Sequence, residues 1–519
     1  MSLHLNKKTI LKKTAQVGSL TFLSRIFGII REIVQVKFLG IGAISDAFIM
    51  AFRIPNLFRR VFAEGAMSAS FVPVMVQAVK KDERDLASGL ITLSLLFFQG
   101  LIFLLFIFVF FKTDFVVSCI AAGFTGERAA YTVKFLRILF PFLFLVSASA
   151  LFAGALNAVN HFFIPAFGQV LWNVMYIGTL FVCVRYQLAP EWVCWGVLIA
   201  GGVQLLSHLV VYFKYRFMFG RITREVLASF KIVLRKFFPC FFGVSIVEIN
   251  LFISAIVASF LPAGDVSLLY YGARFLHLPV GMFVVAFSSI LLPHFSRMVL
   301  YAPKRMSFYL LESTKFVCWI IIPFTIILTL VSEKLFITLF SLKKGAVVYS
   351  TQAQWILIFY LMGLVFLCLN KVFMNIFYSI KDTTSTTIIS VIGAIVNLVG
   401  DIVGMELWGA YGIAGATSLS ALVMALLSVR GLRKKHKFRF YGWDFINFLL
   451  RFIVQIATLI GLGILLFVGF DILVAGRLNL FLESLGGYWF FAMCVAGIFF
   501  LLLLATNKIF GVRVYFLKK

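Results

Sequence analysis

Apolar residues in this chain come in long stretches separated by short polar segments. A membrane-spanning α-helix needs about 20 mostly apolar residues. Alternation of apolar and polar positions at period two, the pattern of a membrane β-barrel, is absent. The pattern therefore predicts an all-α polytopic membrane protein. We expect about 14 transmembrane helices, at 16–40, 45–79, 86–111, 131–157, 162–185, 192–217, 235–262, 266–299, 314–341, 353–379, 384–406, 409–430, 445–470 and 487–508.

A loose internal repeat relates the first twelve stretches. FLGIGAISDAFIMAFRIP (38–55) aligns with FLPAGDVSLLYYGARFLHLP (260–279), so that Arg53 corresponds to Arg274. An even number of spans per repeat gives two halves of the same orientation around a central cavity. We therefore predict two six-helix lobes in a parallel pseudo-repeat, followed by two C-terminal helices. The expected boundaries are 1–225 and 226–440 for the lobes and 441–519 for the C-terminal helices and tail.

Composition and charge support the membrane interpretation. Hydrophobic residues make up 62% of the 519 positions and charged residues 13%, whereas soluble proteins carry about 25% charged residues. The net charge of +27 resides mostly in short segments between apolar stretches, which fits an anionic membrane surface better than a nucleic-acid partner. With a cytoplasmic N-terminus, inner loops hold about 28 Lys and Arg against about 8 outside. Both termini are therefore expected in the cytoplasm.

Six arginines interrupt the apolar stretches, which is costly on a lipid-facing helix. An arginine at the bilayer centre costs about 2.5–3.5 kcal/mol on insertion scales, so these side chains should line a hydrated cavity or pair internally. Asp46, Arg53 and Arg60 recur every seven residues and therefore share one helix face. The six are Arg25, Arg31, Arg53, Arg59, Arg60 and Arg274.

Acidic residues near these arginines are too few to neutralise all of them. Glu64 follows Arg60 by four residues, and Glu32 follows Arg25 by seven. Because a guanidinium matches a phosphate bidentately, the arginine excess predicts a receptor for an anion such as a diphosphate. The alternative is structural, with the arginines locking helices together through Glu32, Asp46 and Glu64.

A second group of polar residues lies in the eleventh and twelfth predicted spans. Asn397 and Asp401 are one helical turn apart, and Thr417 follows on the next span. A carboxylate, an amide oxygen and a hydroxyl are hard oxygen ligands for a cation such as Na⁺. The alternative is that Asp401 is a solvated carboxylate at a helix end. No other cofactor is expected.

One long motif resembles the N-terminal signature of the MurJ/MviN family, which belongs to the multidrug/oligosaccharidyl-lipid/polysaccharide flippase superfamily. The motif is SRIFGIIREIVQVKFLGIGAISDAFIMAFRIPNLFRRVFAEGAMSASFVPV (24–74). Further similar segments are AAGF (121–124), FPFLFLVSASALFAGALNAVNHFFIPAF (140–167) and YYGARFLHLPVGMFVVAFSSILLPHFS (270–296). These matches follow the family order over the first two-thirds of the chain.

The resemblance implies a transporter rather than an enzyme: a flippase that moves lipid II, the undecaprenyl-diphosphate-linked peptidoglycan precursor, between the leaflets of the bacterial inner membrane by alternating access. By motif, the family's substrate-binding arginines fall on Arg25, Arg31, Arg59 and Arg274. We assign to the cavity or its gates Glu32, Asp46, Arg53, Arg60, Glu64 and His277. A sodium site of the family falls on Asn397, Asp401 and Thr417. Lipid II and membrane lipids are the expected partners of a monomer, and cell-wall synthases stay open as further ones.

Two departures from the family pattern stand out. Ser254 occupies a seventh-span position where relatives often place an acid or amide of the cation site. Ala273 and His277 flank Arg274 where relatives carry acids, and His277 would add positive charge below about pH 6.5. Among alternatives, a flippase or exporter of another polyprenyl-linked oligosaccharide ranks ahead of a membrane glycosyltransferase or polymerase. Such an enzyme needs positioned acid and base groups, and the predicted outer loops are short.

Overall fold

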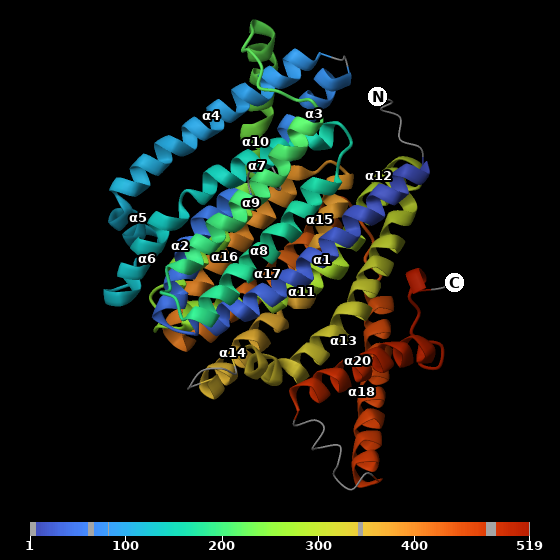
Figure 1. Cartoon of the computed structure of the whole chain (residues 1–519). Coiled ribbons are helices and arrows are strands. Elements are labelled where there is room, and N and C mark those ends of the chain that lie inside the picture. Colours follow the sequence, from blue (N-terminus) through green and yellow to red (C-terminus); the bar gives the residue numbers. More distant parts are fainter. Residues whose placement is uncertain (1–6, 61–66, 81–82, 341–345, 474–483, 518–519) are drawn as a thin grey trace. The chain divides into compact units, whose positions relative to one another are not determined.

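A computed structural model describes residues 7–60, 67–80, 83–340, 346–473 and 484–517 (Figure 1). Within these ranges the regular elements are all helical. Ten of the helical segments are long and apolar enough to cross a membrane. The prediction of an all-α polytopic membrane protein is confirmed, and the count of 14 spans stays a prediction.

The described residues form two compact units, one ending at Ser267 and the other beginning at Leu268. The lobe boundaries expected near residues 225 and 440 stay predictions. The first unit contains the helices α1 (Lys7–Leu39), α2 (Ala43–Arg59), α3 (Met67–Lys80), α4 (Arg84–Phe111), α5 (Thr113–Ile120), α6 (Gly126–Leu139), α7 (Phe142–Ala158), α8 (Phe163–Tyr186), α9 (Trp192–Lys214) and α10 (Arg224–Ala258).

In the first unit, α8 packs against both α1 and α9, and α2 packs against α6. Large apolar side chains from α3, α4, α7, α9 and α10 form a shared core. This core includes Phe71, Leu90, Phe98, Leu151 and Tyr212, all of which are essentially inaccessible to solvent. In each of these helices, apolar residues recur at a spacing of three or four and therefore share one face. These apolar faces pack against one another and form the core.

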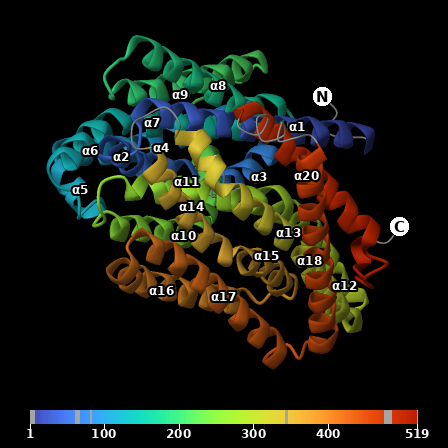
Figure 2. The same cartoon turned by 90° about the horizontal axis from the view of Figure 1, so that it is seen from below.

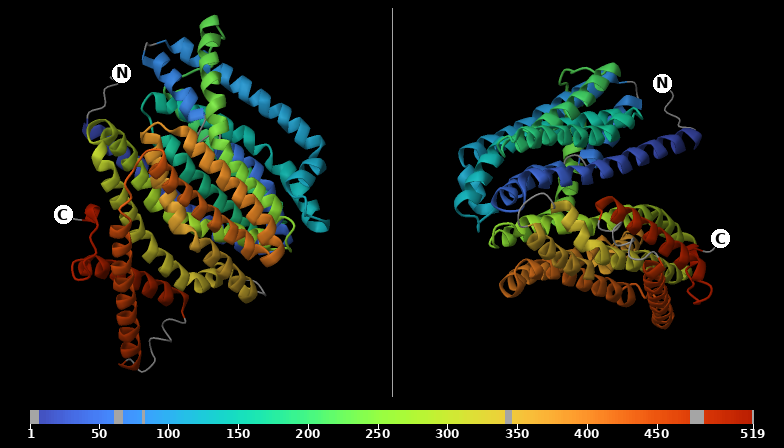
Figure 3. Two further views of the ribbon diagram at one scale, coloured as in Figure 1. Left: turned by 180° about the vertical axis from the view of Figure 1, so that it is seen from behind. Right: turned by 60° about the horizontal axis from the view of Figure 1, so that its bottom comes forward.

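The second unit begins within α11 (Asp265–Pro279) and continues through a π-helical turn η2 (Val280–Val284) into α12 (Val285–Tyr301). Then follow η3 (Pro303–Arg305), α13 (Met306–Phe340), α14 (Ala346–Met362), α15 (Leu364–Ser379), α16 (Thr383–Trp408), α17 (Ala410–Lys434), α18 (Gly442–Leu473), α20 (Leu485–Thr506) and η4 (Tyr515–Leu517). The two helices α16 and α17 lie side by side over their length (Figures 2 and 3).

Several predicted spans contain more than one helix, as the span expected at 45–79 contains α2 and α3. The span expected at 131–157 contains α6 and α7, which meet at Phe140 and Pro141; proline cannot donate an amide hydrogen bond to the preceding turn. The span expected at 353–379 contains α14 and α15, which meet at Gly363. A Cβ at that glycine would lie 2.4 Å from the Cα of Ser418, so α17 can approach only because residue 363 lacks a side chain.

The α16–α17 pair turns at Gly409, whose φ of 59° is in the left-handed region that favours glycine. Beside the turn, the two backbones touch through Gly404 and Gly412. A Cβ added at Gly412 would lie 1.9 Å from the carbonyl oxygen of Gly404. Small residues at a helix crossing allow such an approach inside a membrane, where packing rather than the hydrophobic effect associates helices.

A carboxylate outside the spans holds the connection between α15 and α16. The Asp382 side chain accepts hydrogen bonds from the Ser385 amide at 3.1 Å and the Ser385 hydroxyl at 2.7 Å. It also pairs with Lys435 Nζ at 2.8 Å and with His436 Nε2 at 2.7 Å. Burial would raise the pKa of Asp382, but the hydrogen bonds from Lys435, Ser385 and His436 outweigh it and hold that pKa well below its usual value. The carboxylate therefore stays charged and ties the start of α16 to the end of α17.

Candidate functional site

The polar face of α2 packs toward α10 and the connection that follows it. At the start of this face, Asp46 accepts hydrogen bonds from Gly264 and Ser267. Arg53 Nη1 donates to the carbonyl oxygen of Leu251 at 2.8 Å. Arg60 Nη1 lies 2.8 Å from Glu248 Oε1, and both residues are partly accessible to solvent. The seven-residue spacing thus predicted a shared face correctly, and Arg53 and Arg60 bind protein groups there.

Asp46 is the most enclosed member of this face, with no solvent-accessible surface. Its Oδ2 accepts the Gly264 amide at 2.7 Å, and its Oδ1 accepts the Ser267 amide at 2.8 Å and the Ser267 hydroxyl at 2.5 Å. Arg128 Nη2, from the first turn of α6, lies 3.2 Å from Oδ2. We call Asp46, Arg128, Gly264 and Ser267 the Asp46 cluster.

Two further contacts reinforce the same end of the first unit. Arg128 Nη1 donates to the carbonyl oxygen of Leu261 at 2.8 Å. The Gly123 amide donates to Ser259 Oγ at 3.0 Å, and a Cβ at Gly123 would fall 2.5 Å from the Cα of Phe260. The connection before α6 and the segment after α10 are therefore in backbone contact, which favours a closed arrangement of these helix ends.

Arg31 lies in the packed interface between α1 and α8. Its Nη2 is 2.5 Å from Oε1 of the neighbouring Glu32, and its Nη1 donates to Asn173 Oδ1 at 3.1 Å. The guanidinium also lies 5.1 Å from the ring centroid of Trp172. Asn173 in turn donates to the backbone and hydroxyl oxygens of Ser24. Arg31 is thus held in a fixed orientation by one acid, one amide and one aromatic face.

The other predicted arginines of the first unit have different surroundings. Arg25 is exposed on α1 and makes no ion pair or side-chain hydrogen bond with any residue that the structure describes. Arg59 donates through Nε and Nη2 to Asn56 Oδ1 at 3.2 and 3.1 Å. Glu64, expected to pair near them, lies outside the described residues. Within the described residues, therefore, the donors of Arg25 are available to a ligand.

In the second unit, α11 carries Arg274 and His277. The guanidinium of Arg274 lies 4.7 Å from the ring centroid of Tyr270, and its Nη2 donates to the Tyr270 hydroxyl one turn earlier. Arg274 is partly buried, whereas His277 is exposed. The tyrosine fixes the guanidinium through its ring and hydroxyl without neutralising its charge.

The residues of the predicted cation site lie along the α16–α17 contact. Asn397 and Asp401 are both buried, and Asn397 Nδ2 donates to Asp401 Oδ1 at 3.0 Å. The Thr417 hydroxyl donates to the carbonyl oxygen of Ile413 on its own helix at 3.3 Å. Asp401 is fully enclosed, so it is not a solvated helix-end carboxylate. The amide and carboxylate are brought together as expected.

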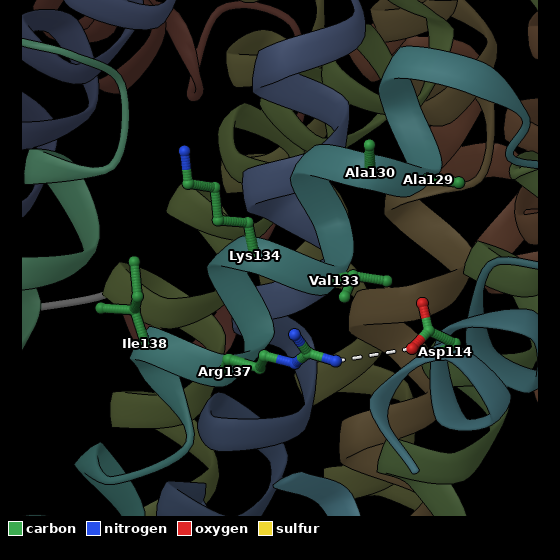
Figure 4. A pocket seen from close by; sticks show the side chains of 7 residues that line it. All are labelled: Asp114, Ala129, Ala130, Val133, Lys134, Arg137 and Ile138. Atoms are coloured by element: carbon green, nitrogen blue, oxygen red, sulfur yellow. Dashed lines mark hydrogen bonds and ion pairs between the residues drawn. The ribbon is translucent and has the colours of Figure 1, made fainter. Parts of the chain in front are cut away.

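A cavity of about 650 Å³ lies at the junction of α5 and α6, outside all the predicted site residues (Figure 4). Arg137 reaches from its wall to Asp114 at 3.5 Å and donates through Nε to Thr113 Oγ1 at 3.1 Å. Lys134 pairs with Glu191. Because each cation of this cavity already has an acidic partner, the cavity offers little attraction for an anion.

Sequence reasoning missed Arg128 and the backbone donors of the Asp46 cluster. Arg128 stands beside Glu127 at the start of a helix, which in sequence looks like an ordinary solvated helix terminus. Ser267 follows Asp46 by 221 positions. The one available signal was the internal repeat: in the register that pairs Arg53 with Arg274, Asp46 corresponds to Ser267, so both stand near the start of equivalent segments.

Comparisons with known proteins agree over most of the chain. A family model described as "Lipid II flippase MurJ" matches residues 35–480. A protein of Buchnera aphidicola named "Probable lipid II flippase MurJ" is 30% identical over 515 residues, covering 94% of this chain and 97% of its own length. The "Lipid II flippase MurJ" of Burkholderia cenocepacia is 30% identical over 449 residues, covering 85% of this chain and 86% of its own length.

Solved structures show the same fold at lower sequence identity. A lipid II flippase MurJ in an inward closed conformation superposes with a TM-score of 0.77 at 24% identity, covering 96% of this chain and 99% of that one. An inward-facing multidrug resistance transporter of the MATE family, in the MOP superfamily, superposes with a TM-score of 0.67 at 15% identity. It covers 80% of this chain and 94% of its own. The helical arrangement is thus shared with transporters.

Proposed function

Because this chain belongs to the MurJ family of lipid II flippases, we propose that it carries lipid II from the inner to the outer leaflet of the bacterial inner membrane by alternating access. The chain is a multi-pass membrane transporter. The observation that carries the proposal is the match of the family over residues 35–480, together with the arginines carried by α1, α2 and α11. The excess of basic residues in one set of connecting segments supports cytoplasmic termini.

We further propose that Arg25, Arg31, Arg59 and Arg274 bind the diphosphate of the substrate. Arg25 supports this assignment most directly, because it is exposed and unpaired within the described residues. Arg31 and Arg274 lie against aromatic rings, Trp172 and Tyr270, and such a ring orients a guanidinium without cancelling its positive charge. A site rich in guanidinium groups favours a diphosphate over a cationic drug.

Transbilayer movement of labelled lipid II in proteoliposomes tests the proposed function. In vesicles that contain the purified chain, labelled lipid II should move from one leaflet to the other. In protein-free vesicles it should stay in its original leaflet. Because the positive charge of the binding site would move in the membrane field, an imposed potential should change the rate, at about 2.3 kcal/mol per charge per 100 mV. If the chain moved another polyprenyl diphosphate but not lipid II, that other lipid would be its substrate. Movement of neither, by folded protein, would contradict the flippase.

We also propose that Asn397 and Asp401 bind Na⁺, with Thr417 as an additional oxygen ligand. The buried carboxylate of Asp401 beside the Asn397 amide supports this, since carboxylate and amide oxygens are hard ligands that suit such a cation. Asp401→Asn is expected to remove any dependence of lipid II movement on Na⁺, as measured in Na⁺ and in choline media. Equal movement in both media for the unmodified chain would rule out a coupling role for this site.

A further inference from the structure

A second cavity, of about 590 Å³, lies within the second unit between α13, the start of α18 and the residues after α20. The matching family model ends at residue 480, so the wall formed by Asn507–Leu517 lies beyond it. We call these residues the C-terminal segment. The lining residues are Phe308, Leu311, Glu312, Lys315, Tyr441, Asp444, Asn447, Phe448, Arg451, Gly511 and Arg513.

The C-terminal segment is fixed at both of its ends. Near its start, Asn507 Oδ1 accepts hydrogen bonds from Trp319 Nε1 and from Gln455 Nε2, each at 3.3 Å. Near its end, the Tyr515 amide donates to Glu312 Oε2 at 2.7 Å, and the ring of Phe516 lies 5.7 Å from that of Phe316. These contacts join the segment to α13 and α18, so this wall of the cavity is packed against the helices.

In this cavity the acidic side chains are compensated, whereas two arginines have no acidic partner among the described residues. Glu312 is 5% exposed, and its two oxygens are taken by Lys315 Nζ at 2.8 Å and by the Tyr515 amide. Asp444 lies in the first turn of α18, where the helix dipole offsets a negative charge. Arg451 donates only to the carbonyl oxygen of Gly511, at 3.3 Å, and Arg513 is exposed without an acidic partner among the described residues. Two guanidinium groups are therefore available to an anion.

The cavity also lies at the ends of two helices that are candidate membrane spans, where lipid headgroups are expected. It lies where α18 begins and just beyond the end of α20, both of which have the length and composition of membrane spans. Trp443, beside it, is 79% exposed, and tryptophan and tyrosine concentrate at membrane–water boundaries. Phe308, Leu311 and Phe448 add apolar surface to the wall, which suits the start of an acyl chain.

We propose that this cavity binds a phosphate group through Arg451 and Arg513, and that the phosphate belongs to an anionic phospholipid of the adjacent leaflet. Basic pockets between membrane helices recognise such headgroups, and two guanidinium forks match the oxygens of a phosphodiester. None of the arginines proposed for transport is among the residues that line this cavity. Its ligand would hold the C-terminal segment, α13 and α18 together from outside.

Binding of short-chain phosphatidylglycerol to the full-length, delipidated chain in detergent tests this proposal. The double variant Arg451→Gln/Arg513→Gln should bind it about 30-fold more weakly, because two charge-assisted contacts are lost. Lys508→Gln is the matched control, since Lys508 is an exposed cation of the same segment that does not line the cavity. Asp444→Asn should instead strengthen binding a few-fold, an effect that mere unfolding would not produce.

Inorganic phosphate as a second probe distinguishes the source of the ligand. Binding of phosphatidylglycerol but not of inorganic phosphate supports a lipid headgroup, whereas phosphate binding that is lost in the double variant assigns the site to the free ion. Equal phosphatidylglycerol binding by the unmodified chain and the double variant, with matching melting temperatures, would overturn the proposal. Lipid II movement measured in parallel separates this result from the proposed transport function.

Discussion

Replacing Arg274 with alanine is expected to slow lipid II movement at least about 100-fold while the protein stays folded. Two charge-assisted hydrogen bonds to a phosphate contribute roughly 3 kcal/mol together, which corresponds to about two orders of magnitude. The folded state should tolerate the change, because the contacts of Arg274 with Tyr270 lie within a single helix. The measurement is the transbilayer rate in proteoliposomes at equal protein content.

Arg274→Lys and Arg185→Ala complete this experiment. Lysine keeps the charge but not the planar fork, so an intermediate rate is expected. Arg185 is an exposed arginine near the end of α8, and its removal should leave the rate unchanged. If Arg274→Ala moved lipid II at the normal rate, Arg274 would not belong to the binding site. If both alanine variants lost activity, the cause would be a general effect of charge.

Replacing Asp46 with alanine is expected to lower the free energy of unfolding by about 3–5 kcal/mol, the cost of breaking a buried charge pair by removing one partner. Arg128 would keep its charge in a largely enclosed place, and the amides of Gly264 and Ser267 would lose their acceptor. The measurement is the thermal unfolding midpoint in detergent. Asp46→Asn should be milder because an amide oxygen still accepts two of the hydrogen bonds.

Asp114→Ala provides the comparison for Asp46. Asp114 also pairs with an arginine of α6, but its side chain is 80% exposed and the pair is 3.5 Å long. Exposed pairs contribute about 0–1 kcal/mol, so this variant should melt close to the unmodified protein. If Asp46→Ala melted equally close, the Asp46 cluster would not hold these helix ends together.

Hydropathy alone predicted the fold class, because long apolar stretches leave a helix as the only backbone that satisfies its own polar groups in lipid. It could not show that two stretches break at Pro141 and Gly363. The Pro141 break has a local signal in the sequence. The Gly363 break depends on the approach of Ser418 from another helix, and no pattern within the stretch itself contains that information.

For the candidate site, too, the sequence predicted which residues share a helix face but not which residues they contact. Periodicity placed Asp46, Arg53 and Arg60 on one face, and it also singled out Asn397 and Asp401, which are bonded to each other. Periodicity could not identify partners, because Leu251 and Glu248 are separated from Arg53 and Arg60 by almost 200 positions. Inside a membrane, where every charge must find a partner or water, the choice of partner is decided by tertiary packing.

The contact between Gly404 and Gly412 has a consequence for ion coupling. Since the backbones of α16 and α17 already touch there, we expect these two helices to move together rather than to slide or tilt against each other. In the proposed transport cycle, Asn397, Asp401 and Thr417 would then keep their mutual spacing. An ion held by them would be released by the departure of a third element or by protonation of the carboxylate, and not by relative motion of the helices that carry its ligands.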